Sequence, residues 1–492
     1  MKKNIFNKIL LVFGIIFIVV QTVLSFLGMQ AIIRSNMFPD IYIIGIIALL
    51  CLFFLLAITM LFLRRARIFG IIISIIISIL MGGAFYYFNI TNEFLNNVTS
   101  SSSVEYKVDK IVAIVHIDDP VETLQGAMDY EFGILENIDR ELVAQTIDEY
   151  TGIMGQTLSY NTYDGLSSML DAFNSGEVQA LIYNQAWNAT LEELEVGFET
   201  KIKILHTSSI ETKQEIIEST IEVTQDAFIV YLSGIDQFEP IATTGRSDVN
   251  MLAVVNPETH QILLVVTPRD YYLEFEHPDI TDGSYYDKLT HAGNSGVQTS
   301  IKALENLYNI SVEHYVRINF TSFIDVVDAL GGVEVYSEQD FITSHFYIPV
   351  YEGYNYFNGD EALAFVRERF NLNEGDFQRG RNQQAMLTGI IEKAMSPAIL
   401  TGYGNILNSL EGNMDTNFSS TEISELVKAQ INDNTKWNII SVAALGYSSS
   451  EHCFSVGSYA SVVLPNEESV ADIQEKIATI LNGGFVEEAI TY

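Results

Sequence analysis

Residues 245–270, "GRSDVNMLAVVNPETHQILLVVTPRD", contain two apolar runs joined by a short polar turn. The runs at 249–256 and 261–267 have the length and the β-branched content of strands, and the turn between them predicts a hairpin. In a hairpin, the start of the first strand and the end of the second lie at the same edge of the sheet. Asp248 and Arg269 are therefore expected to lie close together.

A third strand, predicted at 226–235, adds to this edge. If it pairs antiparallel with 249–256, its end brings Asp236 towards Asp248, and Asp270 follows the hairpin directly. Carboxylate oxygens are ligands that Mg²⁺ and Mn²⁺ prefer, and a divalent ion commonly bridges carboxylates and phosphate. The edge therefore predicts a metal site beside a phosphate-binding group.

A second cluster of charge lies at 365–384, "FVRERFNLNEGDFQRGRNQQ", in a chain whose formal net charge is −36. The spacing of two residues in "FVRER" predicts a strand that carries Arg367 and Arg369 on one face. Arginine forks bind phosphate bidentately and keep their charge at any physiological pH. This cluster predicts the part of the site that binds a diphosphate.

Asp376, Arg379 and Gln383 follow at spacings of three and four residues, which predicts one face of a helix, whereas Arg381 would point elsewhere. Each of these charged residues could also have a purely structural role. Asp376 could simply cap the helix, and an isolated Arg–Asp pair is more often a surface ion pair than a site. The joint clustering favours the functional interpretation.

The surrounding segments alternate between the hydrophobic period of a strand and that of a helix. This alternation predicts an α/β domain with helices on both faces of a sheet. Further predicted strands lie at 312–319 and 333–338, and predicted helices at 296–308, 320–330 and 378–395. A helix is also expected after Ser419, because Ser419 and Glu422 form a capping-box pattern.

The first 90 residues differ from the rest of the chain. Apolar runs at 9–33, 41–63 and 68–90 are each long enough to cross a membrane. Basic residues precede the first run and fill the loop between the second and third, so the amino terminus is expected inside. Those residues are Lys2, Lys3, Lys8, Arg64, Arg65 and Arg67. Three spans would place everything after residue 90 outside the cytoplasm.

The domain organisation expected is a membrane region at 1–90, a Ser-rich linker at 91–104, an accessory domain at 105–225 and a catalytic domain at 226–485. The accessory domain has α/β character, with strands at 110–117 and near 180–184 and helices at 139–150 and 162–173. No constellation of chemical groups stands out in it, which favours a spacing or accessory role.

The charge outside the membrane region excludes some classes of partner. Of the 26 Lys and Arg residues, seven lie in residues 1–90 with one acidic residue, which leaves 19 basic and 61 acidic residues outside. A surface this acidic does not bind nucleic acid non-specifically. Nucleic acid is therefore not expected as a partner.

Four stretches resemble the LytR-CpsA-Psr family: 245–270, "DKLTHAG" at 287–293, "SIKALENLYNISVEHYVRINFTSFIDVVDALGGVEVY" at 300–336, and "DEALAFVRERFNLNEGDFQRGRNQQ" at 360–384. The three amino-terminal spans and the extra domain resemble its CpsA-like, capsule-associated branch. The resemblance implies an α/β/α catalytic domain with a mixed central sheet, preceded by a smaller α/β accessory domain.

The activity implied is that of a membrane-bound phosphotransferase. It would move a glycopolymer, either teichoic acid or capsular polysaccharide, from an undecaprenyl-diphosphate carrier onto peptidoglycan through a phosphodiester link. The partners implied are this lipid-linked glycan, the peptidoglycan acceptor, the cell membrane of a Gram-positive bacterium, and other proteins of capsule or wall synthesis.

The resemblance also implies roles for single residues. Asp236 and Asp248 would bind Mg²⁺, or Mn²⁺ in its place. Arg269, Arg367, Arg369, Arg379 and Gln383 would bind the diphosphate. Asp270 and Asp376 are the candidates for the general base, and a polyprenyl tail would lie between the helices at 320–330 and 385–395.

Two alternatives remain open from the sequence. The same site could hydrolyse the polyprenyl-diphosphate glycan with water, or the protein could be a non-catalytic, lipid-binding regulator of capsule or wall synthesis. A plain core interpretation of the apolar helices at 320–330 and 385–395 also stays open, since apolar residues at helical spacing are usually core.

Overall fold

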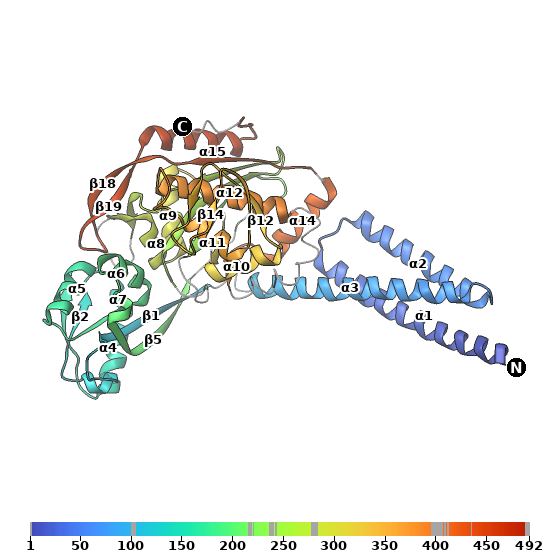
Figure 1. Cartoon of the computed structure of the whole chain (residues 1–492), viewed down its shortest axis with the longest axis horizontal. Coiled ribbons are helices and arrows are strands. Elements are labelled where there is room, and N and C mark those ends of the chain that lie inside the picture. Colours follow the sequence, from blue (N-terminus) through green and yellow to red (C-terminus); the bar gives the residue numbers. More distant parts are fainter. Residues whose placement is uncertain are drawn as a thin grey trace.

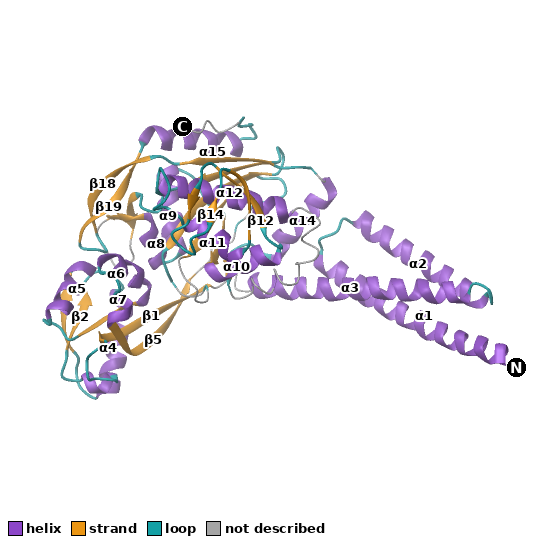
Figure 2. Ribbon diagram, viewed as in Figure 1, coloured by secondary structure: helices purple, strands orange, loops and turns teal. Residues whose placement is uncertain are grey.

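The computed structural model describes residues 2–99, 105–214, 219, 221–235, 241, 244–276, 284–394, 407, 410, 413–433 and 435–487. A helical anchor, a small α/β domain and a larger α/β domain follow one another along the chain (Figure 1). Figure 2 shows that the anchor consists of helices joined by short loops, whereas both of the other parts combine helices with strands. The fold class expected from the sequence is confirmed.

The anchor consists of α1 (Lys2–Ser35), α2 (Asp40–Phe62) and α3 (Arg67–Thr99). Each helix contains a segment long and apolar enough to cross a membrane, and large apolar side chains such as Ile41 and Ile79 are exposed on them. The three predicted spans are confirmed by length and composition.

The linker predicted at 91–104 is wrong over its first part. Residues 91–99 continue α3 as a helix, and residues 100–104 lie outside the described residues. Phe94 and Leu95 explain the difference, because both are buried in a cluster with Met37 and Leu407. Tertiary packing therefore outweighs the polar composition of this segment.

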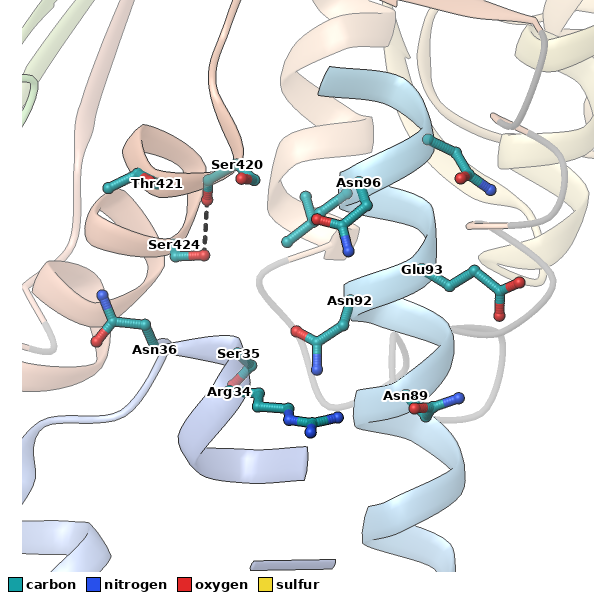
Figure 3. Close-up of a pocket in the computed structure, with 12 residues that line it drawn as sticks. Arg34, Ser35, Asn36, Asn89, Asn92, Glu93, Asn96, Ser420, Thr421 and Ser424 are labelled. Atoms are coloured by element: carbon teal, nitrogen blue, oxygen red, sulfur yellow. Dashed lines mark hydrogen bonds between the residues drawn. The ribbon is translucent and has the colours of Figure 1, made fainter. Parts of the chain in front are cut away.

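The end of α3 also packs beside α14 (Ser420–Asp433) of the larger domain. A pocket at this junction is lined mainly by amide and hydroxyl side chains of α1, α3 and α14 (Figure 3). Arg34 extends from the end of α1 towards α3, and Asn92 lies across from it. The anchor and the catalytic domain therefore meet through an apolar cluster bordered by polar groups.

The accessory domain contains a five-stranded mixed sheet in the order β3-β2-β4-β1-β5. Its strands are β1 (Glu105–His116), β2 (Glu131–Leu135), β3 (Ser159–Tyr163), β4 (Ala180–Asn184) and β5 (Ile202–Gln214). Its helices include α4 (Arg140–Met154), α5 (Leu166–Ser175), α6 (Asn188–Leu194) and α7 (Phe198–Lys201), with short 3-10 turns at Leu124–Ala127 and Gln185–Trp187.

Helices cover both faces of this small sheet. Val143 and Tyr150 of α4 are buried in one apolar cluster, and Met169 and Phe173 of α5 are buried in the other. The predicted strands and helices are found, except that the helix expected from residue 162 begins at Leu166, since 159–163 forms β3.

The larger domain is built on a six-stranded mixed sheet in the order β16-β11-β6-β7-β8-β17. These strands are β16 (Met414–Thr416), β11 (His314–Asn319), β6 (Phe228–Ile235), β7 (Ser247–Asn256), β8 (Gln261–Val266) and β17 (Asn438–Ala443). The strands β6, β7 and β8 are antiparallel neighbours as predicted, with Leu232 opposite Met251 and Val254 opposite Leu263. The parallel pairs β6–β11 and β8–β17 make the sheet mixed.

Alternate side chains of the central strands enter two different cores, as the strand period of two requires. Tyr231 and Leu252 lie in the core with α8 (Leu289–Ser295), α9 (Val297–Tyr308) and α15 (Glu467–Leu481). Val230 and Met251 lie on the opposite face, towards α12 (Asp376–Ala394) and α14. The result is a three-layer α/β/α domain.

One group of elements packs beside this second face. It consists of α10 (Phe320–Ala329), α11 (Gly359–Arg367), β12 (Val333–Ser337), β15 (Gly353–Phe357) and the short strands β13 (Phe341–Ile342) and β14 (Pro349–Val350). The pairs β9 (Tyr272–Glu276) with β10 (Ser284–Lys288), and β18 (Gly446–Cys453) with β19 (Ser458–Pro465), complete the domain.

The strand predicted for "FVRER" is wrong. Arg367 is the last residue of α11, and Glu368 continues in an extended conformation that separates it from Arg369. A capping box between Asn358 and Glu361 starts the helix, and Ala362 and Val366 lie on its buried face at helical spacing. The two arginines therefore leave different elements instead of sharing one strand face.

The accessory domain lies directly against the catalytic domain (Figure 1). The backbone amide of Leu166 donates to the carbonyl of Ser455 at 3.0 Å, and Thr244 Oγ1 donates to the buried Asp109 at 2.9 Å. The Trp187 ring packs edge-on against His291 with 5.8 Å between ring centroids. These contacts fix the accessory domain beside α8, where the candidate site begins.

Candidate functional site

Asp248 at the start of β7 and Arg269 after the end of β8 meet at one edge of the central sheet. Arg269 Nη1 donates to Asp248 Oδ1 at 2.8 Å, and both side chains are largely buried. Thr290 Oγ1, from α8, donates to the same carboxylate oxygen at 3.1 Å. The hairpin geometry that predicted this contact is confirmed.

Two further segments bring charge to the same edge. Asp270 lies within 3.8 Å of Arg269 Nε and within 4.0 Å of Arg369 Nη1. Arg379 forms an ion pair with Asp376 one turn away on α12, and both are largely buried. The structure therefore gathers two carboxylate–guanidinium groups, one from the hairpin and one from the start of α12.

The surroundings shift the pKa values of two carboxyl groups in this cluster in opposite directions. Burial alone would raise the pKa of Asp248, but Arg269 and Arg246 outweigh it and hold the pKa well below its usual range. Burial raises the pKa of Asp376, and the opposing effect of Arg379 does not cancel the rise. Asp248 is thus a fixed negative charge, and Asp376 is a carboxylate that accepts a proton more readily.

Gln383 and Arg367 connect this cluster to an apolar cavity, because Gln383 lines the cavity and Arg367 contacts the Phe320 ring that lines it. The Arg367 guanidinium lies 4.5 Å from the centroid of the Phe320 ring, a cation–π contact. Gln383 lines the cavity and donates from Nε2 to the carbonyl of Val366 at 3.3 Å. The cavity therefore lies next to the charged cluster, since its lining also includes Val249, the neighbour of Asp248 in the chain.

The cavity itself lies between the sheet, α10, α11 and α12, with a volume of about 210 Å³. Leu232, Val249, Phe323, Leu387 and Ile390 are among the apolar side chains that line it. The helices predicted at 320–330 and 385–395 therefore face an apolar cavity here, where plain core was the alternative. Its volume is below that of a typical drug-sized site, so it suits one segment of an apolar chain.

Arg381 belongs to a different part of the surface, as the spacing predicted. Its Nε lies 2.9 Å from Glu338, and its Nη2 lies 2.6 Å from Glu374. Arg317 also lies outside the cluster, since it pairs with Asp415 at 3.0 Å and joins β11 to β16. Asp236, predicted as a metal ligand, lies outside the described residues.

Three charged residues of the cluster were missed by the sequence reasoning. Lys288 Nζ lies 3.6 Å from Asp270, and Arg246 Nη1 lies 2.5 Å from Glu193. Lys288 lies in the quoted stretch 287–293, and this was the available signal. Glu193 lies in the accessory domain, and no local pattern connects it to a site more than fifty residues away.

The fit of a divalent metal can be tested at Asp248. Its Oδ1 is taken by Arg269 and Thr290, whereas Oδ2 has no hydrogen-bond partner among the described residues. An ionised carboxylate with one free oxygen suits Mg²⁺, which typically uses one or two carboxylates together with phosphate oxygens and water. Asp248 thus fits a metal ligand that shares the ion with a phosphorylated substrate.

The comparison with protein families matches residues 195–476, more than half of the chain, to the LytR_cpsA_psr family. The chain belongs to this family. The match spans the central sheet, the arginine cluster and the apolar cavity, so the quoted resemblance is confirmed. The match begins after Glu193, so most of the accessory domain precedes it.

Named relatives share part of the chain. The polyisoprenyl-teichoic acid–peptidoglycan teichoic acid transferase TagU of Bacillus anthracis is 35% identical over 185 residues, covering 37% of this chain and 59% of the relative. TagU of Bacillus licheniformis is 33% identical over 210 residues, covering 41% and 64%. The chain thus spans about three fifths of the length of these relatives.

Solved structures are also similar to it. The crystal structure of B. subtilis TagV is 24% identical, covers 52% of this chain and 98% of that chain, and superposes with a TM-score of 0.43.

Proposed function

We propose that this chain is a membrane-anchored transferase that moves a glycopolymer from a polyprenyl-diphosphate carrier onto peptidoglycan, forming a phosphodiester. The observation that carries the proposal is an apolar cavity that lies next to the arginine cluster. Gln383 lines the cavity one turn along α12 from Arg379, and Arg367 lies over the Phe320 ring that also lines it. A ligand with an apolar tail and a diphosphate head would bind to the cavity and to the arginine cluster at the same time.

The head group would lie among the guanidinium groups. Arg269, Arg367, Arg369 and Arg379 would pair with the diphosphate oxygens, and Gln383 would donate from its amide, which lines the cavity. Guanidinium groups in a partly buried site stabilise charge that develops on a transferring phosphoryl group far more strongly than they would in water. The polyprenyl tail would leave through the cavity between α10 and α12.

The transfer step would be a displacement at phosphorus. An acceptor hydroxyl attacks the phosphorus that carries the glycan, the bond from this phosphorus to the polyprenyl phosphate oxygen breaks, and a phosphodiester and a polyprenyl monophosphate result. The hydroxyl proton passes to a carboxylate. Asp376 suits this role better than Asp270, because burial raises its pKa while Asp270 is surrounded by Arg269, Lys288 and Arg369.

Asp248 and Asp236 would hold a Mg²⁺ ion, which supplies positive charge at the phosphate that leaves. Asp248 contributes to the site in a second way that needs no metal. Its contact with Arg269 Nη1 orients this guanidinium and leaves the remaining N–H groups for the substrate.

The proposed location is the outer face of a Gram-positive cell membrane. The basic residues at the start of α1 and those between α2 and the start of α3 favour the cytoplasmic side, which places both α/β domains outside. The names of the relatives support a teichoic acid donor and a peptidoglycan acceptor. For this chain the proposed polymer is teichoic acid or capsular polysaccharide.

Cells that depend on this chain provide the test. Asp248→Ala and Arg367→Ala should each lower the amount of polymer bound to the wall by at least an order of magnitude, because Asp248 orients Arg269 and Arg367 would bind the diphosphate beside the cavity. The matched control is Arg317→Lys, whose pair with Asp415 lies in the sheet. Normal wall attachment in both alanine variants would rule the proposal out.

A further inference from the structure

Glu193 brings a carboxylate of the accessory domain into the cation cluster of the catalytic domain. It lies on α6, and its Oε1 is 2.5 Å from Arg246 Nη1 and 3.6 Å from Arg269 Nη2. Its Oε2 is 3.9 Å from Lys288 Nζ. Three cations thus surround one carboxylate. A phosphate group would bind to the same three cations.

The charge of Glu193 is stable in this position. Burial alone would raise the pKa of its carboxyl group, but Arg246, and after it Arg269 and Lys288, lower the pKa by more than burial raises it. The carboxylate therefore stays negative over the whole physiological range and repels any anion that approaches the same cations.

The cations do not need Glu193 to hold their places. Arg269 keeps its hydrogen bond to Asp248 and its contact with Asp270, and Lys288 keeps its contact with Asp270. Asp248 also attracts Arg246 electrostatically. Arg269 and Lys288 therefore keep carboxylate partners within the catalytic domain when Glu193 is absent. Glu193 adds a negative charge on the side of these cations that faces the accessory domain.

The accessory domain fixes where Glu193 enters. Trp187, six residues earlier, packs on His291 of α8, and the backbone of Leu166 is hydrogen bonded to Ser455. The Glu193 side chain itself is 40% exposed, so it can rotate away without any separation of the domains. The matched family region begins at residue 195, so this carboxylate lies outside it.

We propose that Glu193 is a specificity-determining residue that competes with the ligand for the Arg246, Arg269 and Lys288 cations and so weakens the binding of bare phosphate anions. The inference rests on the proposed function, since it concerns the same diphosphate site. A substrate with a lipid tail and a glycan gains further contacts that displace Glu193, whereas inorganic pyrophosphate gains none. The site then stays available to its lipid-linked donor in a medium that contains free phosphates.

The test uses the full chain in detergent or nanodiscs, with inorganic pyrophosphate as the probe in isothermal titration. Glu193→Gln removes the charge with little change in shape and should tighten pyrophosphate binding about tenfold, as expected for one half-exposed charge near the ligand. Glu193→Asp keeps the charge and should bind about as weakly as the wild type. Glu195→Gln is the matched control, because Glu195 pairs with Lys201 outside the cluster.

A second readout separates competition from a structural role. In a transfer assay, the inhibition constant of pyrophosphate should fall about tenfold in Glu193→Gln, while the KM for the lipid-linked donor falls less. Unchanged or weaker pyrophosphate binding in Glu193→Gln would overturn the inference, including the case in which loss of Glu193 disorders the cations.

Arg379→Lys distinguishes failure of the inference from failure of the proposed function. If pyrophosphate binds to the wild type and Arg379→Lys weakens it, the diphosphate site stands, and the result for Glu193→Gln alone decides the inference. If pyrophosphate binds to neither the wild type nor Glu193→Gln, both the diphosphate site and the inference are contradicted.

Discussion

Arg379 and Arg381 offer a matched pair, because they lie two residues apart on α12 and belong to different surroundings. Arg379 is 7% exposed and pairs with Asp376 inside the site. Arg381 pairs with Glu338 and Glu374 away from it. Replacement of either by lysine keeps the charge and the helix and removes only the planar fork.

The size of the effect follows from these surroundings. An alanine at 379 would leave Asp376 without its partner in a buried position, at a cost of about 3–5 kcal/mol in folding stability. Arg379→Lys avoids this cost and removes one bidentate contact with the phosphate. Loss of one such donor in a buried site lowers the rate by about 10²–10³-fold, so we expect kcat/KM to fall about 10²-fold.

The assay is transfer of glycan from a polyprenyl-diphosphate donor by the purified full chain, with the melting temperature measured in parallel. Arg381→Lys should retain kcat/KM within about threefold, because its two glutamates can bind a lysine ammonium as well. Equal effects of the two substitutions, or an Arg379→Lys variant of nearly normal activity and unchanged stability, would refute the reasoning.

Three further outcomes are expected. Leu387→Trp fills the apolar cavity and should reduce co-purified polyprenyl lipid severalfold, measured by mass spectrometry, with pyrophosphate binding unchanged. Since burial raises the pKa of Asp376 and a base must be ionised, the acidic limb of the pH–rate profile should lie above the ordinary aspartate pKa of about 3.9, and Asp376→Asn should lose that limb. Gly165→Ala places a Cβ 2.3 Å from the Cα of Gly457 across the domain interface, and should speed proteolytic release of the accessory domain, whereas Gly152→Ala meets open space and should not.

The sheet edge was predictable because its determinants are local. The turn between β7 and β8 fixes the hairpin, and the strand length then fixes the meeting of Asp248 with Arg269. The same holds for the face of α12, where a spacing of three and four residues placed Asp376, Arg379 and Gln383 together and sent Arg381 elsewhere.

Two predictions of secondary structure were wrong because the local sequence fits more than one structure. "FVRER" alternates like a strand, and only the capping box at Asn358 and Glu361 indicates that the helix α11 has begun six residues earlier. Residues 91–99 are polar enough for a linker, yet burial of Phe94 and Leu95 against Met37 keeps them helical. Tertiary contacts of this kind leave no periodic signal.

The remaining members of the site depend on contacts between distant segments. Lys288 and Arg246 join the cluster because α8 and the start of β7 lie side by side, and Glu193 joins it because a second domain packs there. A sequence shows which side chains can bind phosphate. It does not show which of them a neighbouring domain brings within 4 Å.

Transfer of polymer from a lipid diphosphate to peptidoglycan changes the chemical state of both phosphorus atoms of the donor. The most direct measurement is ³¹P NMR of the products formed by the purified full chain from a polyprenyl-diphosphate glycan, with and without peptidoglycan. We expect a phosphodiester signal on peptidoglycan together with polyprenyl monophosphate, both dependent on the acceptor and both lost in Arg269→Lys. Release of a phosphorylated glycan at the same rate without peptidoglycan would contradict it and identify the chain as a hydrolase.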